Sequence, residues 1–103
     1  MLIKIVDIFT LKRWLDNNEA VIIDVRETEE YKYDCIKGAI NIPLAQLLDN
    51  IDIIESHSDK KIVMQCRIGV RSMNACNMLQ LNGFKSDVYN LEGGINSWRN
   101  SGF

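Results

Sequence analysis

The amino-acid sequence predicts a three-layer α/β/α domain built on a central, mainly parallel sheet of about five strands. Short runs of apolar and β-branched residues recur along the chain, and segments with helical spacing separate them. Strands that alternate with helices favour parallel pairing through right-handed crossovers. With 103 residues, 47% hydrophobic and 25% charged, the chain fits one domain over residues 1–103 and is not of the disordered class.

The first elements are a strand, a helix and a second strand. The apolar run "LIKIV" (2–6) predicts a short strand, and Thr10 is the expected N-cap of a helix over residues 11–18. The run "AVIIDV" (20–25) is typical of a strand buried on both faces. The helix should bury one stripe, formed by Leu11, Trp14 and Leu15.

A less regular region follows. "ETEEYKY" (27–33) predicts a short acidic helix, and "GAINIPL" (38–44) a short strand that ends at Pro43. Apolar residues then recur with the spacing of one helix: Leu44, Leu47, Leu48, Ile51 and Ile54.

The pattern becomes clear again in the second half. "KIVMQ" (61–65) predicts a strand, and "RSMNACNMLQLNG" (71–83) a helix that Gly83 closes as its C′ residue. "SDVYNL" (86–91) predicts the last strand, and Gly93 and Gly94 lead into a helix over 95–102. The helix over 71–83 should place an early-turn residue and an inward stripe against the sheet: Ser72, Ala75, Cys76 and Leu79.

Cys66 follows the strand 61–65 directly, where ligands bind in parallel α/β sheets. A thiolate there would be favoured by the N–H groups of the following turn and by the dipole of the next helix. Arg67 and Arg71 lie in a stretch, 60–86, without Asp or Glu, so they predict a local positive field suited to a small anion. Gly69 allows a tight bend.

The other two cysteines have simpler interpretations. Cys76 belongs to an apolar helical stripe and is expected to pack, whereas Cys35 lies in a connection and is interpreted as incidental. Three cysteines without a secretory signal argue against a disulfide framework. Because the chain has no C-x-x-C pair and one histidine, no zinc site, other metal or cofactor is expected.

Asp24 and Arg26 are two residues apart at a strand end. They could lie near the mouth of the site, but an ion pair that ties the strand to the following loop is favoured. Trp14 and Trp98 are expected to be core or helix-packing residues, and His57 is expected to lie in a surface loop.

Four segments in order resemble the single-domain rhodanese family of sulfurtransferases. They are "VIIDVRETEEY", "IKGAINIPL", "IVMQCRIGVRS" and "NGFKSDVYNLEGGINSWRNSG". The chain departs from the family pattern at Asp34-Cys35-Ile36-Lys37, where Gly-His-Ile-Pro is usual, and this change affects local geometry more than chemistry.

The resemblance implies a rhodanese-like fold and a sulfurtransferase that moves sulfane sulfur through a persulfide on Cys66. The donor would be a small anion such as thiosulfate, and the acceptor would be cyanide or a thiol, which includes a protein thiol. The backbone N–H groups of the loop would surround the outer sulfur, and its arginines would hold the sulfonate. The implied substrate-binding residues are Arg67, Ile68, Gly69, Val70 and Arg71.

Two other functions remain open. The domain could be a binding module or a persulfide carrier that serves one protein partner. A phosphatase or arsenate reductase also uses a Cys…Arg loop, but with five residues between Cys and Arg. Only four residues separate Cys66 from Arg71, which makes a smaller ring suited to a sulfur atom.

The chain carries no signal peptide and no apolar segment long enough to cross a bilayer, so a cytoplasmic protein without membrane contact is expected. Its net charge of −2 argues against nucleic acid as a partner.

Overall fold

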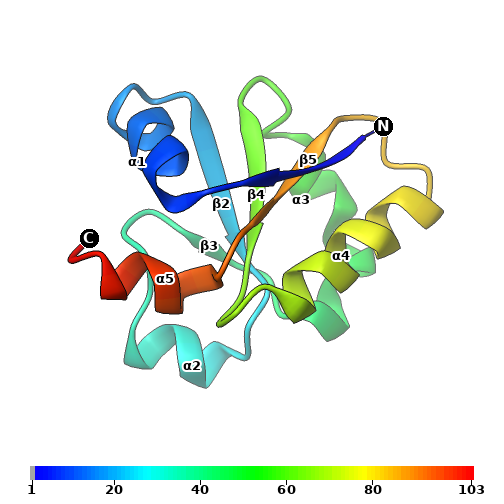
Figure 1. Ribbon diagram of the computed structural model, residues 1–103. Coiled ribbons are helices and arrows are strands. Elements are labelled where there is room, and N and C mark those ends of the chain that lie inside the picture. Colours follow the sequence, from blue (N-terminus) through cyan, green and yellow to red (C-terminus); the bar gives the residue numbers. More distant parts are fainter. Residues whose placement is uncertain (1) are drawn as a thin grey trace.

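A five-stranded sheet forms the centre of the computed structural model, which describes residues 2–103 (Figure 1). Every strand pair is parallel, in the order β1-β5-β4-β2-β3, which confirms the expected α/β architecture. The strands are β1 (Ile3–Val6), β2 (Ala20–Asp24), β3 (Ile40–Asn41), β4 (Lys61–Gln65) and β5 (Val88–Leu91).

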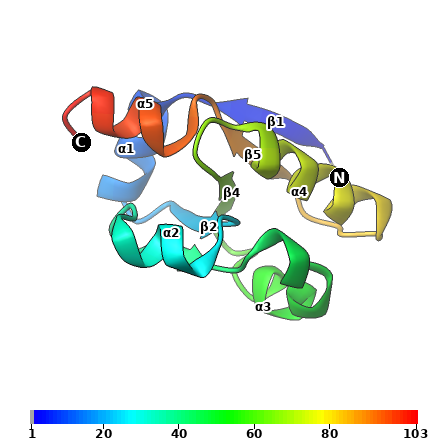
Figure 2. The same ribbon diagram turned by 90° about the horizontal axis from the view of Figure 1, so that it is seen from below.

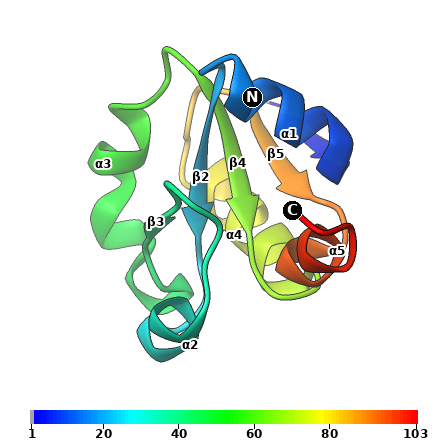
Figure 3. The same cartoon turned by 90° about the vertical axis from the view of Figure 1, so that its left-hand side faces the viewer.

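Helices cover both faces of this sheet. Figure 3 shows α3 on one side and α1 with α5 on the other, and Figure 2 places α4 on the side of α3. Helix α2 lies below the carboxyl ends of the strands (Figure 1). The helices are α1 (Ile8–Asp16), α2 (Thr28–Tyr33), α3 (Ile51–Glu55), α4 (Val70–Leu81) and α5 (Gly94–Asn100).

The central strands β2 and β4 contribute side chains to both faces. Ile62 and Met64 pack toward α3 and α4, whereas Val63 packs toward α1 and α5. Leu11 and Trp98 pack between the sheet and helices α1 and α5, as expected. Cys76 is fully buried in α4, where burial raises the pKa of its thiol to about 12, so the expectation that it packs is confirmed.

The cap of α1 differs from the expectation. Asp7, not Thr10, is the N-cap, and its Oδ1 accepts the N–H of Thr10 at 2.7 Å. A carboxylate in this position satisfies a free N–H and also interacts favourably with the helix dipole. The helix therefore begins at Ile8 and buries Ile8 with Leu11.

Residues 44–54 do not form one helix. Two short 3₁₀ turns, η1 (Leu44–Gln46) and η2 (Leu48–Asn50), precede α3. Asn50 has non-helical dihedrals, and its side chain donates to the carbonyl of Gln46 at 2.7 Å. A side-chain amide that competes for backbone groups in this way interrupts a helix. Leu47 and Ile54 are nevertheless fully buried, so the apolar spacing correctly identified the inward residues.

Within residues 2–103, no helix is both long and apolar enough to span a membrane.

Candidate functional site

The candidate site is the loop 66–71, which leaves the carboxyl end of β4 and enters α4. Gly69 is the N-cap of α4 and has a φ of +109°, a value that side chains other than glycine rarely adopt. This left-handed residue turns the chain back over Cys66. The backbone N–H groups of the first turn of α4 consequently converge on the Cys66 side chain.

The sulfur of Cys66 accepts hydrogen bonds from its own loop. The N–H of Gly69 lies 3.1 Å from Sγ, and the N–H of Ser72 lies 3.3 Å from it. The Ser72 hydroxyl is 3.2 Å from the same sulfur. We call these three groups the sulfur cradle. These hydrogen-bond donors take the place of the water molecules that would hydrate a negatively charged sulfur in solution.

The environment of Cys66 acts on its pKa in two directions. Burial raises the pKa of the thiol, because a charged sulfur loses hydration. The Ser72 hydroxyl and the N–H groups of Ser72, Gly69 and Ile68 act against burial, and the balance lowers the pKa below its ordinary value. Hydrogen bonds from the loop, rather than arginine charge, are therefore the main stabilisers of the thiolate.

Asn90 of β5 extends the sulfur cradle. Its Oδ1 accepts the Ser72 hydroxyl at 2.5 Å, and its Nδ2 donates to the carbonyl of Gly69 at 3.0 Å. The Ser72 hydroxyl has one proton, so it donates either to Asn90 or to a Cys66 thiolate. With a neutral thiol, Cys66 donates to Ser72 and Ser72 donates to Asn90. Ionisation of Cys66 turns the hydroxyl toward the sulfur.

The start of α5 supports the loop from behind. The N–H of Ile95 donates to the carbonyl of Cys66 at 3.0 Å, and the N–H of Asn96 donates to that of Arg67 at 3.1 Å. Gly94 makes this approach possible, because a Cβ there would lie 2.4 Å from the Arg67 oxygen. These bonds hold the loop carbonyls outward, which leaves the loop N–H groups directed at the sulfur.

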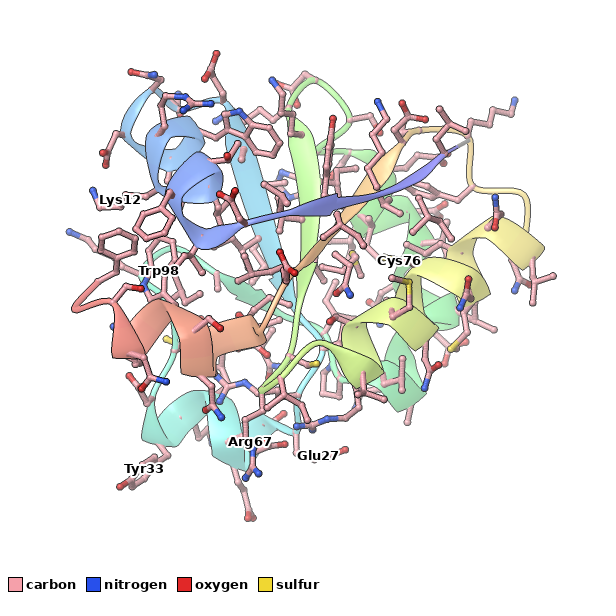
Figure 4. The ribbon with its side chains drawn as sticks, viewed as in Figure 1. Lys12, Glu27, Tyr33, Arg67, Cys76 and Trp98 are labelled. Atoms are coloured by element: carbon pink, nitrogen blue, oxygen red, sulfur yellow. The ribbon has the colours of Figure 1, made fainter. Side chains whose placement is uncertain are left out.

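The two arginines of the loop have different surroundings. Arg71 forms a two-pronged ion pair with Glu30 of α2, with N–O distances of 2.6 and 2.9 Å. Arg67 is exposed, and no ion-pair partner for it lies within residues 2–103. Figure 4 shows Arg67 at the lower end of the molecule, beside α2 and pointing away from the sheet. Glu30 therefore offsets part of the Arg71 charge, which still interacts with a Cys66 thiolate, whereas the charge of Arg67 is not paired.

The sulfur is covered by its own loop. Cys66 is only 1% exposed, whereas Ile68 and Val70 of the same loop are 54% and 62% exposed. In this conformation Sγ is shielded from solvent, and the two apolar side chains form the outer surface of the loop.

Other polar residues singled out in the sequence lie outside the sulfur cradle. Asp24 and Arg26 form a buried ion pair at 2.8 Å, and Arg26 also donates to the carbonyl of Asp34 at 2.7 Å. This link between the strand end and the following loop confirms the favoured interpretation. Cys35 is half-buried in the α2–β3 connection, and His57 is half-exposed after α3.

Sequence reasoning missed Asn90 and Glu30 as neighbours of the loop and noted Ser72 only as an early-turn residue. Asn90 is 18 residues from Ser72, and Glu30 is 41 residues from Arg71. One signal was present, because Asn90 is a polar residue within the apolar run of a strand.

Comparisons with known proteins support one family. The family model for the rhodanese-like domain matches residues 9–101. A tRNA uridine(34) hydroxylase of Erwinia tasmaniensis is 39% identical over 85 residues, which cover 79% of this chain and 24% of that protein. The chain thus spans about a quarter of the length of the curated relatives it matches.

Solved structures agree with this match. A rhodanese-related protein from Thermoplasma volcanium superposes with a TM-score of 0.83 and 30% identity, covering 97% of this chain and 94% of that one. A thiosulfate sulfurtransferase from Pseudomonas aeruginosa gives 0.84 and 25% identity, over 96% of this chain and 19% of that one. The fold, the order of the motifs and the family model together establish that this chain belongs to the rhodanese-like domain family.

Proposed function

We propose that residues 1–103 form a single rhodanese-like sulfurtransferase domain, in which Cys66 carries sulfane sulfur as a persulfide. The observation that carries this proposal is the sulfur cradle, which directs two N–H groups and one hydroxyl at Sγ. The thiosulfate sulfurtransferase with a similar fold supports the reaction class. Such thiol chemistry would take place in the cytoplasm, where thiols stay reduced.

The first half-reaction loads Cys66. The thiolate attacks the outer sulfur of a donor such as thiosulfate, a new S–S bond forms to Sγ, and the S–S bond of the donor breaks. Sulfite leaves with the electron pair, and the total charge is unchanged. A positively charged Arg67 at the mouth of the loop would attract such an anion.

The loop would stabilise the loaded state. The N–H groups of Ile68, Gly69 and Val70 and of the following turn would surround the outer sulfur, with Arg67 and Arg71 as the flanking cations. Donors placed in advance around a developing charge stabilise it without reorganisation. Because Sγ is shielded in this conformation, the loop would open to admit the sulfur donor and return to this arrangement around the outer sulfur.

The second half-reaction passes the outer sulfur to cyanide, a small thiol or a protein thiol. Ile68 and Val70 are exposed on the loop surface, and exposed apolar side chains beside a site favour a protein contact. A persulfide carrier for one protein partner is thus the alternative within the same chemistry. Slow transfer to cyanide with fast transfer to one protein thiol would identify it.

A phosphatase is less well supported by the geometry. A phosphate dianion would need the terminal nitrogens of Arg71, and both already donate to Glu30. The N–H groups of Gly69 and Ser72 also donate to the sulfur itself.

A second candidate comes from the curated relatives. Their name is tRNA uridine(34) hydroxylase, and the 39% identity favours a role of this domain in such a reaction. A hydroxylation assay on tRNA, with Cys66→Ser as the control, tests this candidate. Hydroxylated uridine that depends on Cys66 would support it, and its absence with intact sulfur transfer would leave sulfurtransferase as the function.

The experiment for the proposed function uses the cysteine-containing tryptic peptides. Cleavage after Lys and Arg places each cysteine in a peptide of its own: 33–37, 62–67 and 72–85. After treatment with thiosulfate, a gain of one sulfur is expected on 62–67, removable by reductant. The gain should be absent in Cys66→Ser. Sulfur on 33–37 or 72–85 alone would contradict the assignment of Cys66.

A further inference from the structure

The Glu30 carboxylate is held both by Arg71 of the loop and by the backbone of its own helix. Oε1 of Glu30 accepts from Nη1 of Arg71 at 2.6 Å and from the backbone N–H of Glu27 at 3.0 Å, as the N3 member of the α2 capping box. Oε2 accepts from Nη2 of Arg71 at 2.9 Å. The capping box therefore positions the carboxylate independently of its contact with Arg71. It holds the guanidinium in one orientation.

This ion pair changes the net charge that a sulfur donor meets at the loop 66–71. The guanidinium holds the pKa of Glu30 at about 2, mainly through its hydrogen bonds, so the carboxylate stays ionised at neutral pH. Asp24 and Arg26 behind the pair balance each other as well. Of the three arginines Arg26, Arg67 and Arg71, only Arg67 has no carboxylate partner within residues 2–103.

We propose that Glu30 is a specificity-determining residue that disfavours dianionic donors and selects sulfur donors with at most one negative charge. This inference rests on the proposed function and names its donor class as small alkyl persulfides. Glu30 acts through Arg71 and does not need to touch the donor. Two unpaired arginines would stabilise a bound dianion such as thiosulfate, but only Arg67 is unpaired, because Glu30 offsets the charge of Arg71. The Cys66 thiolate also repels the dianion.

The loading step with a persulfide balances without a co-reactant. The Cys66 thiolate attacks the outer sulfur of the protonated donor R–S–SH, and a bond forms between Sγ and that sulfur. The bond between the two donor sulfurs breaks, and R–S⁻ leaves with its electron pair. The proton stays on the transferred sulfur. Neither donor nor protein needs an outside oxidant or reductant.

The test compares Glu30→Gln with Glu29→Gln. Glutamine at position 30 keeps an oxygen for the Glu27 N–H but loses the charge. Glu29 is exposed on the same helix, and its replacement makes the same change of net charge. The substrates are thiosulfate and 2-hydroxyethyl persulfide. Loading of the peptide 62–67 is followed by mass spectrometry.

Glu30→Gln should lower the KM for thiosulfate roughly three- to tenfold, which is the effect expected from removing one half-exposed negative charge near a dianion. The KM for the persulfide should stay within about twofold of the parent value. Glu29→Gln should leave the ratio of the two KM values unchanged. An unchanged ratio in Glu30→Gln, or an equal change in Glu29→Gln, would overturn the role of Glu30.

A double-substitution cycle tests Glu30 a second time, in a protein that lacks the Arg71 guanidinium. Arg71→Ala leaves the Glu30 carboxylate unpaired beside the loop, so the KM for thiosulfate should rise. Adding Glu30→Gln to Arg71→Ala should return it to the parent value. If the double variant keeps the raised KM, Arg71 binds the donor directly and the inference fails.

The outcomes separate the inference from the function it rests on. Loading of 62–67 by either donor, with KM values that ignore Glu30, would remove the inference and keep the sulfurtransferase. Failure of both donors to load the parent protein would remove both.

Discussion

Replacement of Ser72 by alanine tests the sulfur cradle most informatively. The hydroxyl is 3.2 Å from Sγ of Cys66, and a buried Ser72 leaves no room for bulk water to replace it. Alanine keeps the backbone N–H that also donates to the sulfur. The substitution therefore removes one of the three donors and leaves the loop path unchanged.

The size of the effect follows from the charge on the sulfur. A hydrogen bond to a charged group contributes about 1.5–3 kcal/mol, so the thiolate population below the pKa should fall roughly ten- to hundredfold. A thiolate of higher pKa is also a better nucleophile, with a Brønsted coefficient of about 0.4–0.5. This gain offsets about half of the loss on a logarithmic scale. The loading rate at low pH should thus fall roughly three- to tenfold.

The assay is the rate of sulfur loading on the peptide 62–67 as a function of pH. In both proteins the rate should rise as pH rises through the thiol pKa, and in Ser72→Ala that rise should come at higher pH. Above both pKa values the variant should load at least as fast as the parent. Ser72→Thr, which keeps the hydroxyl, should restore the parent profile.

Two results would contradict a role of the Ser72 hydroxyl in stabilising the thiolate. A Ser72→Ala profile that superimposes on the parent profile means that the hydroxyl does not stabilise the thiolate. A rate that falls by the same factor at every pH means that Ser72 acts on something other than ionisation. Urea unfolding serves as the control, because Asn90 loses its partner and stability should fall by about 1–3 kcal/mol.

Two predictions concern stability. Gly94→Ala should lose more stability than Gly38→Ala in urea unfolding. Both glycines have a positive φ, which costs an alanine about 1–3 kcal/mol, but only at Gly94 would the added Cβ meet loop backbone, 2.4 Å from the Arg67 oxygen. Equal losses of stability would show that this close approach costs nothing. The Glu30–Arg71 pair should stabilise the protein above pH about 4.5, the ordinary pKa of the carboxyl, and this contribution should be lost as pH falls through about 2. The gap between the parent and Glu30→Gln in urea midpoint should accordingly close over that pH range, and a gap that persists at lower pH would contradict the ion pair as its cause.

The fold could be predicted from the sequence because its signals are local. The runs 20–25 and 61–65 became the central strands, and the stripe with Cys76 and Leu79 became the buried face of α4. The errors arose where two local signals compete. Asp7 and Thr10 are both suitable caps, and the Asn50 amide interrupts a spacing that otherwise indicates one helix.

Only those residues of the candidate site that are close together in the sequence could be predicted. Cys66, Gly69 and the arginines are consecutive or nearly so, and a strand followed by a helix places them at one sheet end. Glu30 and Asn90 reach this loop from α2 and β5. Their pairing depends on how the layers pack, which no local pattern contains. The compensation of Arg71 therefore could not be foreseen.

Hydrogen bonds from the loop 66–71 are expected to lower the pKa of the Cys66 thiol below that of an ordinary cysteine. The most direct measurement is the ultraviolet absorbance of the thiolate during a pH titration, taken as the difference between the parent and Cys66→Ser. We expect this difference to appear at a lower pH than for an ordinary cysteine. A difference that appears only at or above the pH of an ordinary cysteine would contradict this expectation.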